Sequence, residues 1–156
     1  MISTQDFIKY SLYCVNVAKE ASVSKTKFGE SYRARARSIY EMIVYGNIPL
    51  TLAYLSSKAS ESLLLECFRI LKENYDKVSD ASKNLAPLVR KISHEQMSYA
   101  AYGASILLII SKVLGLDFKS IDPVVSEIAF DKLAQKYIIE AAKWLKLFSE
   151  AKLPRG

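Results

Sequence analysis

The stretch from Ser93 to Gly115, SHEQMSYAAYGASILLIISKVLG, holds the longest apolar run of the chain, which extends from Tyr99 to Ile110. This run is shorter than the roughly 20 apolar residues that a membrane-spanning helix requires. Ser93 and Gln96 have the spacing of a capping box at a helix N-terminus, and a glycine follows the last apolar residue. The stretch therefore predicts a buried core helix of a soluble protein.

Apolar residues elsewhere in the chain recur at helical spacing. We predict six further helices over residues 3–21, 30–45, 47–59, 61–77, 79–91 and 122–152. In the second of these helices, the predicted inner stripe is Tyr32, Ala36, Ile39 and Ile43. In the last helix, the predicted inner stripe is Phe130, Ala134, Tyr137, Ala141, Trp144 and Phe148.

Capping residues and prolines mark several predicted helix ends. Ser3 with Asp6 forms a capping box for the first helix. Gly46 is placed to end the second helix in the left-handed conformation, and Asn47 to cap the third. Pro87 predicts either a break or a helix start within residues 79–91.

The composition is that of one folded helical domain. Hydrophobic residues make up 51% of the 156 residues and charged residues 24%, which excludes a disordered chain. Only 5 glycines and 4 prolines are present, too few for the many turns of an all-β fold. Because no linker or repeat is visible, we predict an all-α, single-domain bundle of about six to seven helices spanning residues 1–156.

The sequence offers little that indicates catalysis. His94-Glu95 lacks the second histidine of a zinc-protease motif, since Ser98 occupies that position. Glu73 and Glu140 have a lysine at helical spacing, as ordinary surface pairs do. We therefore expect no catalytic residue, no metal and no cofactor, with a carboxylate pair assembled by the fold as the minor alternative.

The two cysteines, Cys14 and Cys67, stand among apolar residues and follow no spacing typical of disulfides or metal sites. Such a pattern favours two reduced, buried thiols in an intracellular protein.

Positive charge is concentrated in two segments of a chain whose net charge is +6. In residues 25–37, Arg33 and Arg37 lie one helical turn apart and Tyr40 continues their stripe, whereas Arg35 falls on another face. Residues 132–155 carry a ridge of lysines opposite the predicted aromatic stripe. Arginine suits phosphate, and an exposed tyrosine can stack on a base. The alternatives are solvated helix faces and, for the last helix, a membrane-surface helix.

Two segments together resemble one protein family. They are YRARARSIYEMIVYGNIPLTLAYLSSKA at residues 32–59 and YIIEAAKWLKLFSEAKL at residues 137–153, about a third of the chain. A basic Tyr/Arg helix, a glycine, a Thr-Leu-Ala-aromatic-Leu run ending in Ser-Lys and a closing Glu-Ala…Trp-Leu-Lys helix appear in that order. In these features the chain resembles the small helical subunit of the Cmr-type (type III-B) CRISPR RNA-guided effector complex.

The resemblance implies a non-catalytic, cytoplasmic ribonucleoprotein subunit of antiviral defence. Its expected partners are other Cmr subunits, copies of itself and the guide or target RNA. The residues expected to face RNA phosphates are Lys25, Lys27, Arg33, Arg35, Arg37, Lys58, Lys132, Lys136, Lys143 and Lys146. The alternatives are a structural adaptor between proteins without RNA contact, and the sister small subunit of a Csm-type complex.

Overall fold

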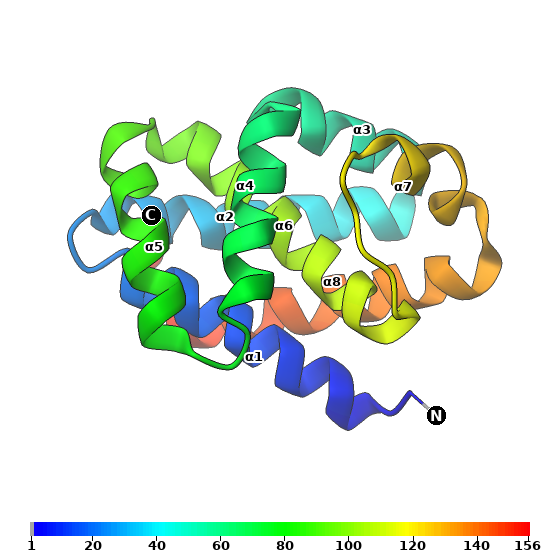
Figure 1. Ribbon diagram of the computed structural model, residues 1–156, viewed down its shortest axis with the longest axis horizontal. Helices are drawn as coiled ribbons and strands as arrows, with labels where there is room; N and C mark the ends of the chain where they lie inside the picture. Colours follow the sequence, from blue (N-terminus) through cyan, green and yellow to red (C-terminus); the bar gives the residue numbers. More distant parts are fainter. Residues whose placement is uncertain (1) are drawn as a thin grey trace.

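The computed structural model describes residues 2–156 and contains only helices and their connections within that range. Figure 1 shows their arrangement. The helices are α1 (Thr4–Ala21), α2 (Thr26–Tyr45), α3 (Ile48–Ala59), α4 (Glu61–Glu73), α5 (Val78–Lys91), α6 (His94–Leu114), α7 (Asp122–Ser126), the 3-10 helix η1 (Ile128–Phe130) and α8 (Lys132–Lys152). The all-α prediction is confirmed. The eight α-helices in the described range exceed the predicted six to seven.

Helix α6 forms the centre of the molecule. Every residue from Met97 to Ser111 is buried, and α1, α2, α3, α4 and α8 all pack against it. The Ser93 side chain caps the helix by accepting a hydrogen bond from the Gln96 amide (3.2 Å), and Gly115 ends it with a φ of 68°. The helix is long and apolar enough to cross a membrane, but 89% of its most apolar window is buried inside this chain. Such burial is typical of a helix that forms the core of a fold.

The α4 helix approaches α6 closely at a glycine. A Cβ atom at Gly103 would lie 2.5 Å from Cδ1 of the buried Leu64. The missing side chain thus leaves the space that Leu64 fills. Figure 1 shows α4 in front of α6.

Helix α2 begins at Thr26, four residues before its predicted start. Phe28 is fully buried, and the Lys25 Nζ atom donates hydrogen bonds to the carbonyls of Val89 (2.9 Å) and Ile92 (2.8 Å) at the end of α5. These contacts with a distant segment extend the helix into a stretch whose own composition is polar. The four residues of the predicted inner stripe of α2 are buried, as expected.

The connection from α2 to α3 corrects one expectation. Gly46 has φ −124° and ψ −139°, which is not the left-handed conformation. Glycine fits here for another reason, because a Cβ atom would lie 2.6 Å from the Met42 carbonyl oxygen. The next expectation is confirmed, since the Asn47 side chain accepts a hydrogen bond from the Leu50 amide (2.9 Å) and caps α3.

The predicted helix over residues 122–152 is divided into α7, η1 and α8. Asp131 has extended backbone angles, and its carboxylate accepts a hydrogen bond from the Ala134 amide (2.8 Å), so α8 has its own N-cap. The polar cap competes with helix continuation at this point.

The inner stripe predicted for the last helix is wrong in most of its positions. The buried residues of α8 are Ala134, Ile138, Ala141, Ala142, Leu145 and Ser149. Phe130 is exposed in η1, and the aromatic side chains of α8 are half-buried on one flank of the core stripe. The small alanines lie innermost, which moves the bulky rings to the side of the helix. There, Tyr137 contacts Phe7 of α1 at 5.7 Å between ring centroids.

Pro87 neither breaks nor starts a helix, but lies within α5. Proline removes the backbone hydrogen bond to the carbonyl four residues earlier, that of Lys83. Both residues are exposed, so water satisfies this carbonyl.

The cysteines follow the prediction. Cys14 and Cys67 are free and buried, and burial raises the pKa of each thiol to about 12. Both thiols are therefore protonated at neutral pH and pack as small apolar groups.

Of two buried tyrosines in the core, one has a hydrogen-bonded hydroxyl and the other does not. This difference predicts opposite effects of their substitution by phenylalanine on stability. The Tyr32 hydroxyl bonds to Ser105 Oγ (2.7 Å), whereas the buried Tyr102 hydroxyl has no partner. We expect Tyr102→Phe to raise the free energy of unfolding by about 1 kcal/mol, because it removes an unsatisfied polar group. Tyr32→Phe should lower it by about 1 kcal/mol, because Ser105 loses a partner. Urea denaturation of both variants measures the two changes in the free energy of unfolding. A loss of stability in Tyr102→Phe would contradict a Tyr102 hydroxyl without a hydrogen-bond partner.

Candidate nucleic-acid interface

The two basic segments meet along the line where α2 packs against α8. Arg33 Nη1 donates a hydrogen bond to the Leu153 carbonyl (3.0 Å), just beyond the end of α8. The Lys146 Nζ atom lies 5.5 Å from the centroid of the Tyr40 ring. The α2 stripe of Arg33, Arg37 and Tyr40 therefore faces α8, and we call this surface the α2–α8 seam.

The carboxylate of Glu150 lies among the cations of the seam. A hydrogen bond from Lys146 Nζ, 3.1 Å from Glu150 Oε1, is the main reason that the pKa of Glu150 lies below its usual value. The positive charges of Lys146, Arg37 and Arg33 lower this pKa further. Three cations thus surround one carboxylate, so positive charge is in excess at the seam.

Lys143, like Lys146, forms an ion pair with a glutamate of α8 itself. Its Nζ atom lies 2.7 Å from Glu140 Oε1, which confirms that Glu140 belongs to a surface pair. Lys132 and Lys136 are both exposed nearer the start of the helix. The lysines of α8 are therefore spread along its outer surface from end to end.

Arg35 belongs to the opposite flank of α2. Its guanidinium donates a hydrogen bond to the Tyr99 hydroxyl of α6 and lies 4.6 Å from the Tyr99 ring centroid. Lys58 of α3 is close to the same place, with Nζ 5.6 Å from the centroid of the Tyr54 ring. Arg35 and Lys58 thus form a second basic cluster, separate from the seam.

Lys25 and Lys27 stand at a third place, near the end of α5. Lys25 is engaged by two α5 carbonyls, as described above, whereas Lys27 is exposed. Arg90 and Lys91 lie in the chain between those carbonyls and are exposed. Arg90 and Lys91 were not predicted from the sequence to lie beside Lys25, because the two segments are some 60 residues apart in the chain.

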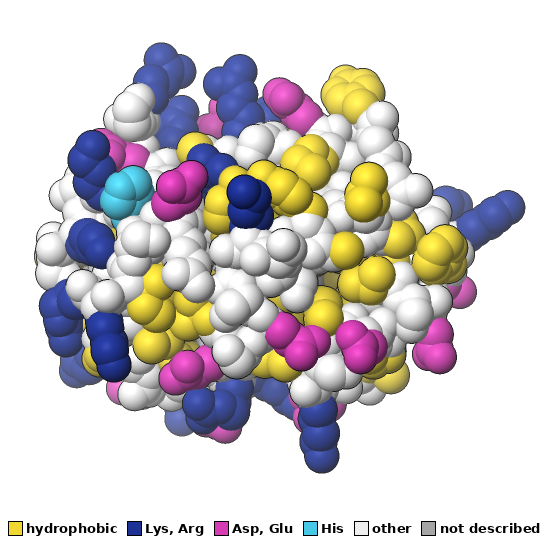
Figure 2. All heavy atoms as spheres, turned by 90° about the horizontal axis from the view of Figure 1, so that it is seen from above, with side chains coloured by type: hydrophobic (Ala, Val, Ile, Leu, Met, Phe, Trp, Pro, Cys, Tyr) yellow, Lys and Arg dark blue, Asp and Glu magenta, His cyan; other side chains and the backbone are white. Residues whose placement is uncertain are grey.

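The ten predicted residues therefore form no single patch. Figure 2 shows Lys and Arg side chains mainly toward the left-hand end and the edges of one face, and hydrophobic side chains over its right-hand half. Five of the ten are exposed: Lys27, Arg37, Lys58, Lys132 and Lys136.

The largest exposed apolar side chains gather where α2 ends, α3 begins and η1 meets α8. The exposed fractions of Tyr45, Leu50 and Phe130 are 85%, 68% and 65%. A hollow of about 310 Å³ lies among Gly46, Pro49 and Phe130. We call this region the apolar end. An exposed apolar group of this kind is typical of a surface that contacts another protein.

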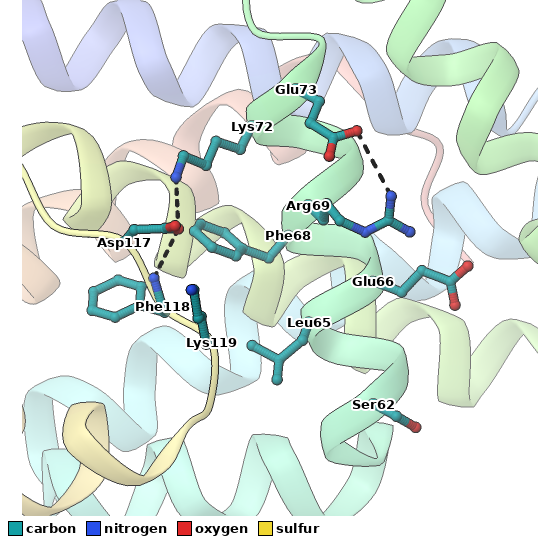
Figure 3. A pocket seen from close by; sticks show the side chains of 10 residues that line it. All are labelled: Ser62, Leu65, Glu66, Phe68, Arg69, Lys72, Glu73, Asp117, Phe118 and Lys119. Carbon is teal, nitrogen blue, oxygen red and sulfur yellow. Dashed lines mark hydrogen bonds and ion pairs between the residues drawn. The ribbon is translucent and has the colours of Figure 1, made fainter.

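A pocket of about 700 Å³ lies between α4 and residues 117–119 (Figure 3). Lys72 Nζ lies 2.6 Å from Asp117 Oδ1, and this hydrogen bond is the main cause that lowers the pKa of Asp117. Glu73 pairs with Arg69 (3.7 Å) rather than with the predicted Lys77. Charges of both signs alternate around the pocket, so it favours no class of ligand.

Residues 2–156 contain no group of three or more His, Cys, Asp or Glu side chains placed to hold a metal ion. The single histidine, His94, is half-buried, and its Nδ1 atom lies 2.7 Å from Ser31 Oγ. This contact ties the start of α6 to α2.

Comparison of the chain with protein families, curated proteins and solved structures gives no match.

The geometry of the seam predicts how Glu150 titrates. Lys146→Met removes the hydrogen bond that contributes most, so the pKa of Glu150 should rise. Because a lowered carboxyl pKa stabilises the fold above the unfolded-state pKa, the variant should lose more stability at neutral pH than at acid pH. Arg37→Gln should raise the same pKa less. Carbon-13 NMR of the carboxyl group measures both shifts.

The matched control is Lys72→Met, which should raise the pKa of Asp117 and leave that of Glu150 unchanged. A Glu150 pKa that is insensitive to both Lys146 and Arg37 would show that these cations do not converge on it.

Proposed function

We propose that this chain is a non-catalytic small subunit of a Cmr-type (type III-B) CRISPR ribonucleoprotein complex, which contacts the backbone of guide or target RNA through the α2–α8 seam. The observation that carries the proposal is the packing of α2 against α8. The two segments that resemble the family, residues 32–59 and 137–153, include most of these two helices. The α2 part of the first segment and the α8 part of the second therefore lie side by side. At their contact, the cations Arg33, Arg37 and Lys146 outnumber the carboxylate of Glu150.

The seam suits phosphates better than it suits bases. Arginine donates paired hydrogen bonds to phosphate oxygens, and such contacts position a strand without specifying its sequence. In RNA-guided complexes base pairing supplies the specificity, so a subunit of this kind needs no base-reading site. The exposed Arg37, and Lys146 beside Tyr40, provide the positive charge.

We assign no catalytic step to this chain, and we expect it to work in the cytoplasm as part of antiviral defence. The α8 carboxylates of Glu140 and of Glu150, which lies at the seam, are each bound to a lysine. They serve in our proposal to orient the cations rather than to act as acids or bases.

A structural adaptor role is the second candidate, and the apolar end favours it. Tyr45, Leu50 and Phe130 come from three elements and form an exposed apolar surface. A neighbouring subunit or another copy of the chain would bury these side chains. RNA contact at the seam and protein contact at the apolar end are compatible, so the adaptor role stands alone only if the seam binds no RNA.

The RNA contact is tested by neutralising charge at the seam in the assembled complex. We expect Arg37→Gln with Lys146→Gln to weaken RNA binding. The slope of log affinity against log salt concentration should also fall by about 0.7 for each phosphate of a single strand that the variant no longer neutralises. The control is Lys77→Gln with Lys83→Gln, which removes the same charge from exposed positions at α5. Equal weakening by both pairs would indicate a bulk charge effect and contradict a seam-specific contact.

The protein contact is tested by placing a charge on the apolar end. Leu50→Asp should reduce recovery of the chain with its partner subunits, because the aspartate cannot be buried without loss of hydration. Val23→Asp is the control, since Val23 is 82% exposed in a different loop. Co-purification of the complex measures the difference. Undiminished assembly of Leu50→Asp would remove the apolar end from the interface.

A further inference from the structure

The half-buried Arg35 carries a positive charge that no carboxylate neutralises. Among the described residues, the ion pairs involve other cations, and Arg35 forms none. Within residues 2–156 its guanidinium donates one hydrogen bond, to the Tyr99 hydroxyl, and its Nε atom is buried without a partner. A guanidinium that is largely withdrawn from water and left unpaired is costly. This imbalance points to an anion that completes the site.

Two tyrosines connect Arg35 to a second cation. The Tyr99 hydroxyl lies 3.3 Å from the Tyr54 hydroxyl, and Lys58 Nζ lies 5.6 Å from the Tyr54 ring centroid. The hydrogen bond with Tyr99 is the main cause that raises the pKa of Tyr54, so this hydroxyl stays protonated. The two hydroxyls hold two hydrogens and share one bond, which leaves one hydrogen for a further acceptor.

A pocket of about 260 Å³ opens beside this cluster. Lys58 and Tyr99 line it together with the first turn of α6, which contributes Ser93, Glu95 and Gln96. The start of a long helix adds a partial positive charge. Lys58 and Glu95 are the cation and the carboxylate that line the pocket, so their charges cancel. Arg35 does not line it, but it contacts the lining through the Tyr99 hydroxyl and adds one positive charge that no carboxylate of the described residues pairs with. This one positive charge suits a single phosphodiester, and the Glu95 carboxylate can accept a hydrogen bond from a ribose hydroxyl.

We propose that Arg35, Tyr54, Lys58 and Tyr99 form a binding site for one nucleotide of a single-stranded RNA. The phosphate lies in the pocket beside Lys58 and Tyr99, whose hydroxyl contacts Arg35, and the base stacks on the half-buried ring of Tyr54. Cations combined with an aromatic platform are the general means by which proteins hold single strands without reading their sequence. The site lies on the flank of α2 opposite the seam, and its assignment to RNA rests on the proposed function.

The test is an NMR titration of the full chain with hexauridylate at low salt, read from backbone amide shifts. We expect shifts in residues 54–59 and 93–99. Tyr54→Ala should weaken the binding by about tenfold, the effect of losing one base stack. Lys58→Gln should also weaken it and reduce its salt dependence. The control, Lys83→Gln, lies on exposed α5 and should bind as the unchanged chain does.

Uridine monophosphate provides a second arm that separates a strand from a free nucleotide. We expect it to bind far more weakly than hexauridylate, and equal affinity would overturn the assignment to a strand. Arg35→Lys keeps the charge but loses the planar fork, and should weaken hexauridylate binding. The unshifted amides of each variant report whether it remains folded.

Shifts confined to α2 and α8, with Lys58→Gln unchanged, would overturn the nucleotide site and leave the proposed function standing. An absence of shifts in every region would also overturn the site. In that case the variants of Arg37 and Lys146 in the assembled complex decide separately whether the seam contacts RNA.

Discussion

The burial of α6 on every side is the constraint on which the rest of the structure depends. A helix whose residues 97–111 are all withdrawn from water needs neighbours around its full circumference, and five helices provide them. Two of its buried serines fit this environment because they bond locally, Ser98 to the Glu95 carbonyl (2.6 Å) and Ser105 to the Ala101 carbonyl (2.8 Å). Each outer helix therefore packs its apolar face against α6. The direction of that face decides where the charged residues on the rest of the helix lie.

Helix α2 shows how this constraint distributes the basic residues. Successive residues of an α-helix are about 100° apart, so Arg33 and Arg35 project in nearly opposite directions once Tyr32 and Ile39 are buried. Arg33 is directed to α8, and Arg35 to α6 and α3. A charge run that is continuous in sequence is thereby divided between two sites of different character. One site is an open seam, and the other is an arginine enclosed with tyrosines beside a pocket.

Local sequence signals predicted the parts of the fold that depend on neighbouring residues. The caps at Ser3, Asn47 and Ser93, the central helix and the inner stripe of α2 follow from spacing alone. The early start of α2 did not, because it rests on Phe28 burial and on Lys25 bonding to α5. The burial pattern of α8 was also missed, since alanine stripes are a weaker apolar signal than aromatic ones.

The features of the candidate site also fall into those that could be predicted from the sequence and those that could not. The stripe of Arg33, Arg37 and Tyr40 was predictable, because it depends only on helical periodicity. The meeting of α2 with the end of α8 was not, since Arg33 and Leu153 are 120 positions apart. Nor could the sequence predict that Tyr99 would accept a hydrogen bond from Arg35, or that Glu150 would lie among three cations.

Amide hydrogen exchange of this chain within the assembled ribonucleoprotein, compared with and without its RNA, tests the role of the seam most directly. Exchange slows where a bound strand restricts local opening. We predict that RNA slows exchange in the exposed turns of α2 around Arg37 and in the second half of α8, while the buried part of α6 from residue 100 to 111 stays unchanged. Protection that appears only at the apolar end around Leu50, with none along α2 and α8, would contradict contact between the seam and RNA.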